Sequence, residues 1–305
     1  MGIVGTVLSI FLLLFIGYGT KKVRLLRAED ADLLNTVVIY ITLPAFIFDA
    51  IYSYRQPLPL SIAKVPIIGF AMILAVLGVA YIIGRALKLD GPTLGGMIIA
   101  SGFGNTGFLG YPVVLAAFQQ KGALVTAALY DELAMALPLY TVGVLIAAGF
   151  AGKHVRGRQL LRVLALPALW AIPAALLLRA IALPEPLLAA IGYLGSGTIP
   201  LVMISLGLSL SARSLKGVGI PVLAVCVLKL GLLPVLTHYA LQAGGVTGTM
   251  YKVGVLESGM PSAVMTGVLA SKFGANGSFV AGVIFVSTLL SIVTIPATLL
   301  ILGAP

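Results

Sequence analysis

The stretch LGGMIIASGFGNTGFLGYPVVLAAF, from Leu94 to Phe118, is a long apolar run with glycine, asparagine, threonine and proline near its centre. An apolar run of this length can cross a lipid bilayer as a helix. Within a bilayer, glycine and proline release backbone donors and acceptors, which are tolerated only against protein or a water-lined cavity. The stretch therefore predicts a membrane-spanning helix that is broken mid-membrane, against protein or a water-lined cavity.

The whole chain has the composition of a membrane protein. Of its 305 residues, 60% are hydrophobic and 9% are charged, whereas soluble domains carry about 25% charged residues. Mean hydropathy is +1.14. The single Cys226 excludes an intrachain disulfide. These observations exclude a soluble globular or disordered protein and predict an all-α polytopic membrane protein.

Counting about 20 apolar residues per crossing predicts ten membrane-spanning helices. They lie near residues 3–20, 33–51, 62–84, 93–118, 123–150, 159–181, 186–209, 218–240, 250–272 and 279–302. This count leaves no room for a separate soluble domain.

The prolines indicate an internal repeat with a period of half the chain. Prolines at the same relative span of each half are 155 to 158 residues apart: Pro44 and Pro200, Pro66 and Pro221, Pro138 and Pro296. We predict two five-helix repeats, residues 1–152 and 153–305. Because five is an odd number, the repeats insert with opposite orientations. Inverted repeats are typical of secondary transporters, whose substrate and ion sites form near the midplane where the repeats meet.

The positive charges predict the orientation. Thirteen of the 19 Lys and Arg residues fall on one set of loops, five fall on the other set, and Lys229 lies within a span. By the positive-inside rule the richer loops are cytoplasmic, so both termini are expected on the non-cytoplasmic side of the cell (inner) membrane. No basic stripe is interleaved with aromatic residues, so nucleic-acid binding is not expected.

The ninth predicted span is broken at the position that corresponds to the break in the fourth. It reads YKVGVLESGMPSAVMTGVLASKF, from Tyr251 to Phe273. The N-termini of half-helices suit an anion, and freed carbonyl groups suit a cation. Close helix packing through small residues is the alternative explanation. We predict a substrate site made by residues of both breaks: Asn105, Thr106, Gly107, Pro112, Ser258, Pro261 and Ser262.

Ionisable residues within the spans are candidates for ion coupling. Glu257 directly precedes the second break, where a carboxylate can bind sodium or carry a proton; a structural carboxyl paired with Lys229 is the alternative. Asp131 and Glu132 are neighbours, about 100° apart on a helix. We therefore expect only one of them to face the site, and favour Asp131 because it shares a face with Met135. Lys229 is a candidate counter-ion to Glu257 or Asp131, or a contact to the substrate anion.

Three segments resemble bacterial members of the auxin efflux carrier family. They are IYITLPAFIFDAI (Ile39 to Ile51), GNTGFLGYPVV (Gly104 to Val114) and GMPSAVMTGVLASKFG (Gly259 to Gly274). The resemblance covers the whole chain and implies a fold shared with bile acid:sodium symporters, in which helices 4 and 9 are broken and cross. It further implies a scaffold of helices 1, 2, 6 and 7, a transport domain of helices 3–5 and 8–10 that moves as an elevator, and a homodimer.

The resemblance also assigns individual residues. Asn105, Thr106, Pro112 and Pro261 match the crossover of the family. The segment ESGM, from Glu257 to Met260, is similar to the segment that ligates sodium in the bile acid symporters. With Asp131, which the charge pattern adds, the predicted coupling site for an ion or proton comprises Glu257, Asp131, Met260 and Asn105. No cofactor is expected, and a sodium ion is one candidate ligand of this site. The plant carriers lack sodium coupling, whereas this chain keeps the glutamate.

Together these observations predict a secondary active transporter of a small organic anion, auxin-like or a dicarboxylate, and not an enzyme. An uncoupled or gated anion channel, or a sensor, is the alternative. An intramembrane hydrolase is disfavoured because Tyr130-Asp131 has no G-x-G-D partner motif in the chain. Substrate identity, direction of transport and the coupling ion are not determined by the sequence.

Overall fold

The computed structural model describes residues 3–210 and 219–303, and regular structure in this part of the chain is entirely helical. Two of the predicted cytoplasmic charges, Arg213 and Lys216, lie outside the described residues. Helices occupy each of the ten ranges predicted from the sequence, with ends that differ by a few residues. The assignment of each range to a membrane crossing, and the repeat that it implies, stay predictions.

The helices up to residue 150 are α1 (Ile3–Lys22), α2 (Asp30–Val37), η1 (Val38–Thr42), α3 (Leu43–Tyr52), η2 (Leu60–Ala63), α4 (Lys64–Ala86), α5 (Gly91–Gly102), η3 (Thr106–Gly110), α6 (Tyr111–Phe118), α7 (Lys121–Leu129), η4 (Tyr130–Ala136), η5 (Leu139–Gly143) and α8 (Val144–Phe150). The helices that follow are α9 (Gly157–Leu160), η6 (Leu161–Ala165), α10 (Pro167–Leu178), α11 (Glu185–Ser196), α12 (Thr198–Ser209), α13 (Ile220–Val227), η8 (Leu228–Leu232), α14 (Leu233–Ala243), α15 (Gly248–Ser258), α16 (Val264–Phe273) and α17 (Gly277–Ile301).

Within the described residues, six continuous helices are long and apolar enough to cross a membrane, or seven if one pair bent by 49° counts as a single span. The six are Asp30–Tyr52, Leu60–Ala86, Lys121–Phe150, Glu185–Ser209, Ile220–Ala243 and Gly277–Ile301. The bent pair is Gly157–Ala165 with Pro167–Leu178. The protein is therefore an all-helical, multi-pass membrane protein.

Several of these long helices contain a π-helical turn placed just before a proline. Four of the five π-helical segments in the described chain, η1, η3, η4 and η8, are followed two residues later by a proline: Pro44, Pro112, Pro138 and Pro234. Proline lacks the N–H that a helix needs, and its ring clashes with the carbonyl one turn earlier. A widened turn at that point lets the helix continue through the proline.

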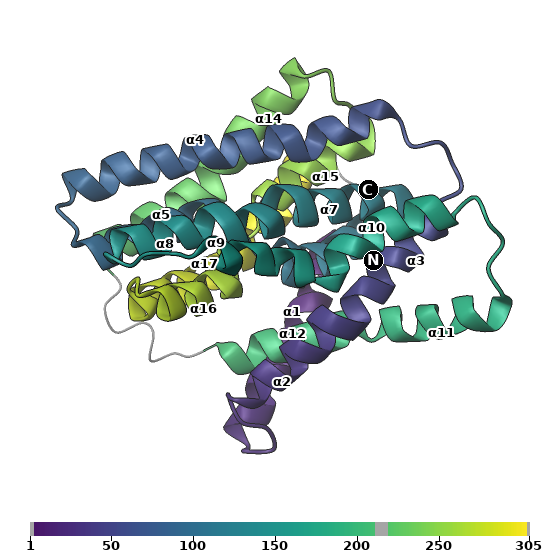
Figure 1. Cartoon of the computed structure of the whole chain (residues 1–305), viewed down its shortest axis with the longest axis horizontal. Coiled ribbons are helices and arrows are strands. Elements are labelled where there is room, and N and C mark those ends of the chain that lie inside the picture. The colour runs from purple at the N-terminus through teal and green to yellow at the C-terminus, as the bar shows by residue number, and fades with distance from the viewer. Residues whose placement is uncertain (1–2, 211–218, 304–305) are drawn as a thin grey trace.

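The helices pack as two groups (Figure 1). In one group α1 and α2 pack on α12, and α3 packs on α10 and α11. In the other group α4 packs on α5 and α14, α15 on α7, and α16 on α17. In the first group, glycine lets α12 and α1 approach closely: a Cβ on Gly207 of α12 would lie 2.6 Å from the backbone nitrogen of Tyr18 in α1. Such close backbone contact is typical of membrane helix pairs with small residues at their interface.

Candidate functional site

The two broken helices cross at their breaks. α5 ends at Gly102 and η3 begins at Thr106, while α15 ends at Ser258 and α16 begins at Val264. The connecting segments run antiparallel, with Gly104 opposite Ser262. This arrangement places the ends of four half-helices around one point. The glycine and proline in both sequences predicted the two breaks, and the family resemblance implied the crossing.

Two backbone hydrogen bonds join the crossing segments. The N–H of Asn105 donates to the carbonyl of Pro261 at 2.7 Å, and the N–H of Ala263 donates to the carbonyl of Phe103 at 3.0 Å. The bonds satisfy backbone groups that the breaks would otherwise leave unpaired in the membrane interior. The crossover is therefore a bonded unit formed by both halves of the chain.

A cavity of about 90 Å³ adjoins the crossover. Its walls come from both helix groups, with Ile39 and Leu43 from η1 and α3, and Leu166 and Ala168 from the start of α10. The remaining walls belong to the crossing segments, η3, η4, η5 and α16. The cavity therefore lies at the boundary between the two groups of helices.

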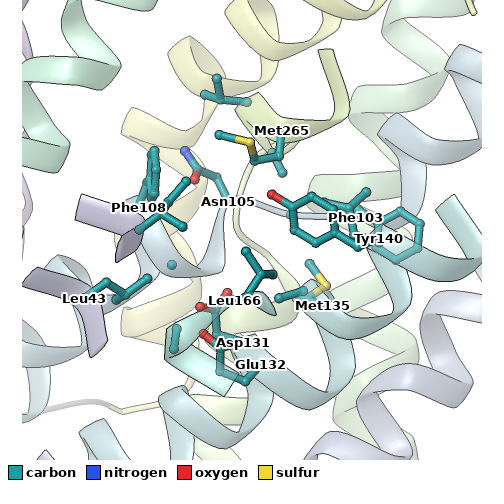
Figure 2. A pocket seen from close by; sticks show the side chains of 18 residues that line it. Leu43, Phe103, Asn105, Phe108, Asp131, Glu132, Met135, Tyr140, Leu166 and Met265 are labelled. Atoms are coloured by element: carbon teal, nitrogen blue, oxygen red, sulfur yellow. The ribbon is translucent and has the colours of Figure 1, made fainter. Parts of the chain in front are cut away.

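Asn105 lines this cavity and has an unpaired side-chain donor. The residue is 5% exposed, and its Nδ2 has no hydrogen-bond partner among the described residues. Its backbone carbonyl accepts the N–H groups of Leu109 at 3.0 Å and Gly110 at 3.1 Å, which fixes its position at the start of η3. Figure 2 shows Asn105 among the side chains that line the cavity, with Asp131 and Glu132 on another wall. A buried amide without a partner is the kind of group that a bound ligand satisfies.

Both acidic residues of η4 line the cavity, which differs from the expectation that only one would. Asp131 and Glu132 are both buried and both contribute to its walls (Figure 2). The hydroxyl of Thr106 donates a hydrogen bond to Asp131, and a Cβ on Gly107 would lie 2.9 Å from Oδ2 of the same carboxylate. The segment is π-helical, so its turn is wider than an α-helical turn and neighbouring side chains diverge less.

Glu257 is buried behind the crossover. It is 0% exposed, and neither carboxylate oxygen accepts a hydrogen bond from any described residue. The carboxyl packs on the backbone of Gly110, where an added Cβ would lie 2.7 Å from Oε1 and 2.8 Å from Cδ. Glycine at this position therefore makes room for the acid.

Lys229 bonds to the crossover instead of to an acid. Its side chain is 0% exposed, and its Nζ donates to the backbone carbonyl of Ser258 at 2.6 Å. Because Glu257 accepts no hydrogen bond within the described chain, the hydrogen-bonded pair of Lys229 and Glu257 that the sequence left open is not formed. The ammonium group lies instead at the C-terminal end of α15, where a helix dipole favours a positive charge.

The other predicted site residues shape the crossover and do not line the cavity. Ser258 donates its hydroxyl to the carbonyl of Val255 at 2.7 Å, and Ser262 donates to the carbonyl of Ala100 at 2.7 Å. These hydroxyls cap helix ends that the breaks expose. Three further predicted residues, Pro112 near the start of α6, Met260 and Pro261, are buried outside the cavity walls.

The chain matches the family described as membrane transport protein over residues 2–299. The protein belongs to this family. The match confirms the resemblance to auxin efflux carriers and places the chain among transporters and not enzymes.

Three relatives of this membrane transport protein span nearly the full chain. An uncharacterized transporter of Methanothermobacter thermautotrophicus is 34% identical over 299 residues, covering 97% of both chains. An uncharacterized transporter of Methanocaldococcus jannaschii is 34% identical over 298 residues, covering 95% of both. A protein of Rhizobium meliloti named "Putative malonate transporter" is 26% identical over 309 residues, covering 97% of this chain and 95% of that one.

Sequence reasoning about this membrane transport protein missed most of the cavity walls. Glu132 was set aside, and four large apolar or aromatic residues were not singled out: Phe103, Phe108, Tyr140 and Met265. In a chain that is 60% hydrophobic, apolar side chains carry no signal that separates a cavity wall from a lipid-facing surface. The one usable signal was closeness in sequence to a helix break, which Phe103 and Phe108 have.

Proposed function

We propose that this protein is a secondary active transporter of a small carboxylate, with a dicarboxylate such as malonate as the first substrate to test. The name of the Rhizobium meliloti relative supports this substrate class. The cavity of about 90 Å³ suits a small ligand.

The observation that carries the proposal is the unpaired amide of Asn105 beside two helix beginnings. The cavity walls include Gly107 and Phe108 in the first turn of η3, and Val264 and Met265 in the first turn of α16. The first N–H groups of a helix have no carbonyl one turn earlier to bond. Together with Nδ2 of Asn105, these groups can bind the oxygens of a carboxylate.

The position of the cavity between two helix groups supports alternating access by an elevator motion. In this proposal α1, α2, α3, α10, α11 and α12 form the scaffold of a homodimer, and the other helices move with the crossover. Ten spans arranged as inverted repeats would place both termini on the non-cytoplasmic side. The bridged residues Gly104 and Ser262 support the repeat, because they are 158 residues apart and their segments exchange two hydrogen bonds.

Glu257 is our candidate for coupling to sodium or protons. Its two buried oxygens without a donor fit a cation or a proton. No cluster of three or more His, Cys, Asp or Glu side chains that could hold a metal ion occurs in the described part of the chain. Sodium, which prefers oxygen ligands, would therefore be held by few carboxylates; the proposed contributors are Glu257, Asp131, Asn105 and Met260.

Uptake of radiolabelled malonate into proteoliposomes tests the proposal. We expect accumulation driven by an inward sodium or proton gradient, and loss of gradient dependence in Glu257→Gln. The matched control is Glu185→Gln, an exposed carboxylate in the first turn of α11. Asn105→Ala should abolish uptake. Undiminished gradient dependence in Glu257→Gln would contradict the role of this acid, and single-channel currents without accumulation would support a gated channel instead.

A further inference from the structure

Lys229 packs against both segments of the crossover. Its Nζ bonds to the carbonyl of Ser258, and a Cβ added to Gly104 would lie 2.8 Å from both Nζ and Cε of the lysine. The same point is 3.1 Å from Cε of Met135. The ammonium group therefore packs against the side of Gly104 from which a side chain is missing.

Gly104 and Met135 both line the cavity, whereas Lys229 does not. The lysine is thus separated from the cavity by a residue with no side chain and by a methionine. Gly104 is part of the bridge to Ser262, so its backbone is fixed by the crossover. A charge in this position acts on the cavity through a single layer of protein.

The cavity walls lack a positive charge of their own. Among the 18 described residues that line the cavity, none is Lys, Arg or His, and two are acidic, Asp131 and Glu132. Charges attract or repel strongly across short distances when little water lies between them. A carboxylate in this cavity would meet two acids in the walls, and Lys229 is a basic residue placed immediately behind Gly104 and Met135.

We propose that Lys229 is the specificity-determining charge of the substrate site, and that it selects a dianionic carboxylate by acting across the bare backbone of Gly104. The inference rests on the proposed function, because it concerns the ligand of the same cavity. Lys229 does not touch the substrate in this arrangement. It is a positioning residue whose Nζ is held at the C-terminal end of α15, next to the cavity wall formed by Gly104 and Met135.

The test compares two ligands of similar size and different charge, malonate and its monoamide malonamate. Binding to the purified full chain is measured by calorimetry at constant ionic strength. We expect the wild-type protein to bind malonate more tightly than malonamate. In Lys229→Met, the affinity for malonate should fall roughly 10- to 100-fold, as expected for the loss of one nearby charge in a site of low dielectric. The affinity for malonamate should fall less, so the ratio of the two affinities should become smaller than in the wild-type protein.

Lys252→Met is the matched control. Its Nζ also donates to a backbone carbonyl, that of Gly303 at 2.6 Å, but the bond is exposed and lies away from the cavity. We expect this variant to keep the wild-type affinities for both ligands. Lys229→Arg, which keeps the charge, should keep the preference for malonate.

Three results would overturn the inference. They are equal affinity of the wild-type protein for the two ligands, an unchanged preference in Lys229→Met, and an equal loss of both ligands in that variant. The first measurement requires no variant, so it can overturn the inference even if Lys229→Met does not fold, and Lys229→Arg, which must keep the preference for malonate, gives a second test. Failure of the wild-type protein to bind any carboxylate would instead contradict the proposed function.

Discussion

Gly110→Ala should displace the buried carboxyl of Glu257. An alanine Cβ at this position would lie 2.7 Å from Oε1 and 2.8 Å from Cδ of the acid. Real Cβ atoms essentially never approach another heavy atom within 3.0 Å, so either the carboxyl or the helix backbone has to shift. The acid is 0% exposed, which leaves it little free space to shift into.

The magnitude follows from two opposing effects. Forcing an extra methyl group into a packed interior costs about 1–3 kcal/mol. Replacing glycine by alanine within a helix gains about 1 kcal/mol, because alanine loses less backbone entropy. Gly78→Ala in α4 isolates the second effect, since nothing lies within 4 Å of the added Cβ. The two variants should therefore differ in unfolding free energy by about 1–3 kcal/mol.

Two assays measure the consequences. Thermal unfolding in one detergent should give a lower Tm for Gly110→Ala than for Gly78→Ala, and Glu257→Ala should reverse that loss when it is combined with Gly110→Ala. Proteoliposome uptake should lose its dependence on an ion gradient in Gly110→Ala and keep that dependence in Gly78→Ala. Equal Tm values for the two glycine variants, or additive effects of Gly110→Ala and Glu257→Ala, would refute the contact on which this reasoning rests.

Three further outcomes are expected. Gly207→Ala should destabilise the protein by about 3 kcal/mol, because the new Cβ meets the main chain of α1, which unlike a flexible side chain cannot move aside. Urea unfolding in detergent measures the loss of stability, and an unchanged unfolding midpoint would contradict the close packing of α1 and α12. Thr106→Val should lower the free energy of unfolding by about 1–3 kcal/mol, because it removes the hydrogen-bond donor to buried Asp131. The same unfolding assay measures this loss, and an unchanged free energy would mean that the hydrogen bond is not formed. Leu166→Trp should fill the cavity and block malonate binding while Tm is maintained; wild-type calorimetric affinity would contradict this.

The positions of the helix breaks could be predicted because membrane interiors penalise unpaired backbone groups. Glycine and proline clustered within two apolar runs marked both breaks, and the structure ends α5 at Gly102 and α15 at Ser258. Asn105 in the first break lines a cavity, and its role in binding stays a prediction. These features follow from local sequence, because a break needs only the residues that make it.

The side-chain contacts across the crossover could not be predicted from the sequence. Lys229 was a candidate counter-ion to Glu257 or Asp131, or a contact to the substrate anion. The structure shows it bonded to the carbonyl of Ser258, and Glu257 packed on Gly110. Each of these contacts joins helices that are far apart in the chain, so their register decides which atoms meet. The π-helical turn that brings Glu132 to the cavity beside Asp131 also changes the angle assumed for an ordinary helix.

The crossover also constrains how the protein is made. Each of its two hydrogen bonds joins a residue from the first half of the chain to one from the second, so a nascent chain that has released only the first half lacks the partners of Asn105 and Phe103. Exposed to hydrocarbon, such groups are costly. The first half is therefore expected to stay with the insertion machinery until the Pro261 segment arrives, and the crossover is expected to be among the last parts of the protein to form during biosynthesis.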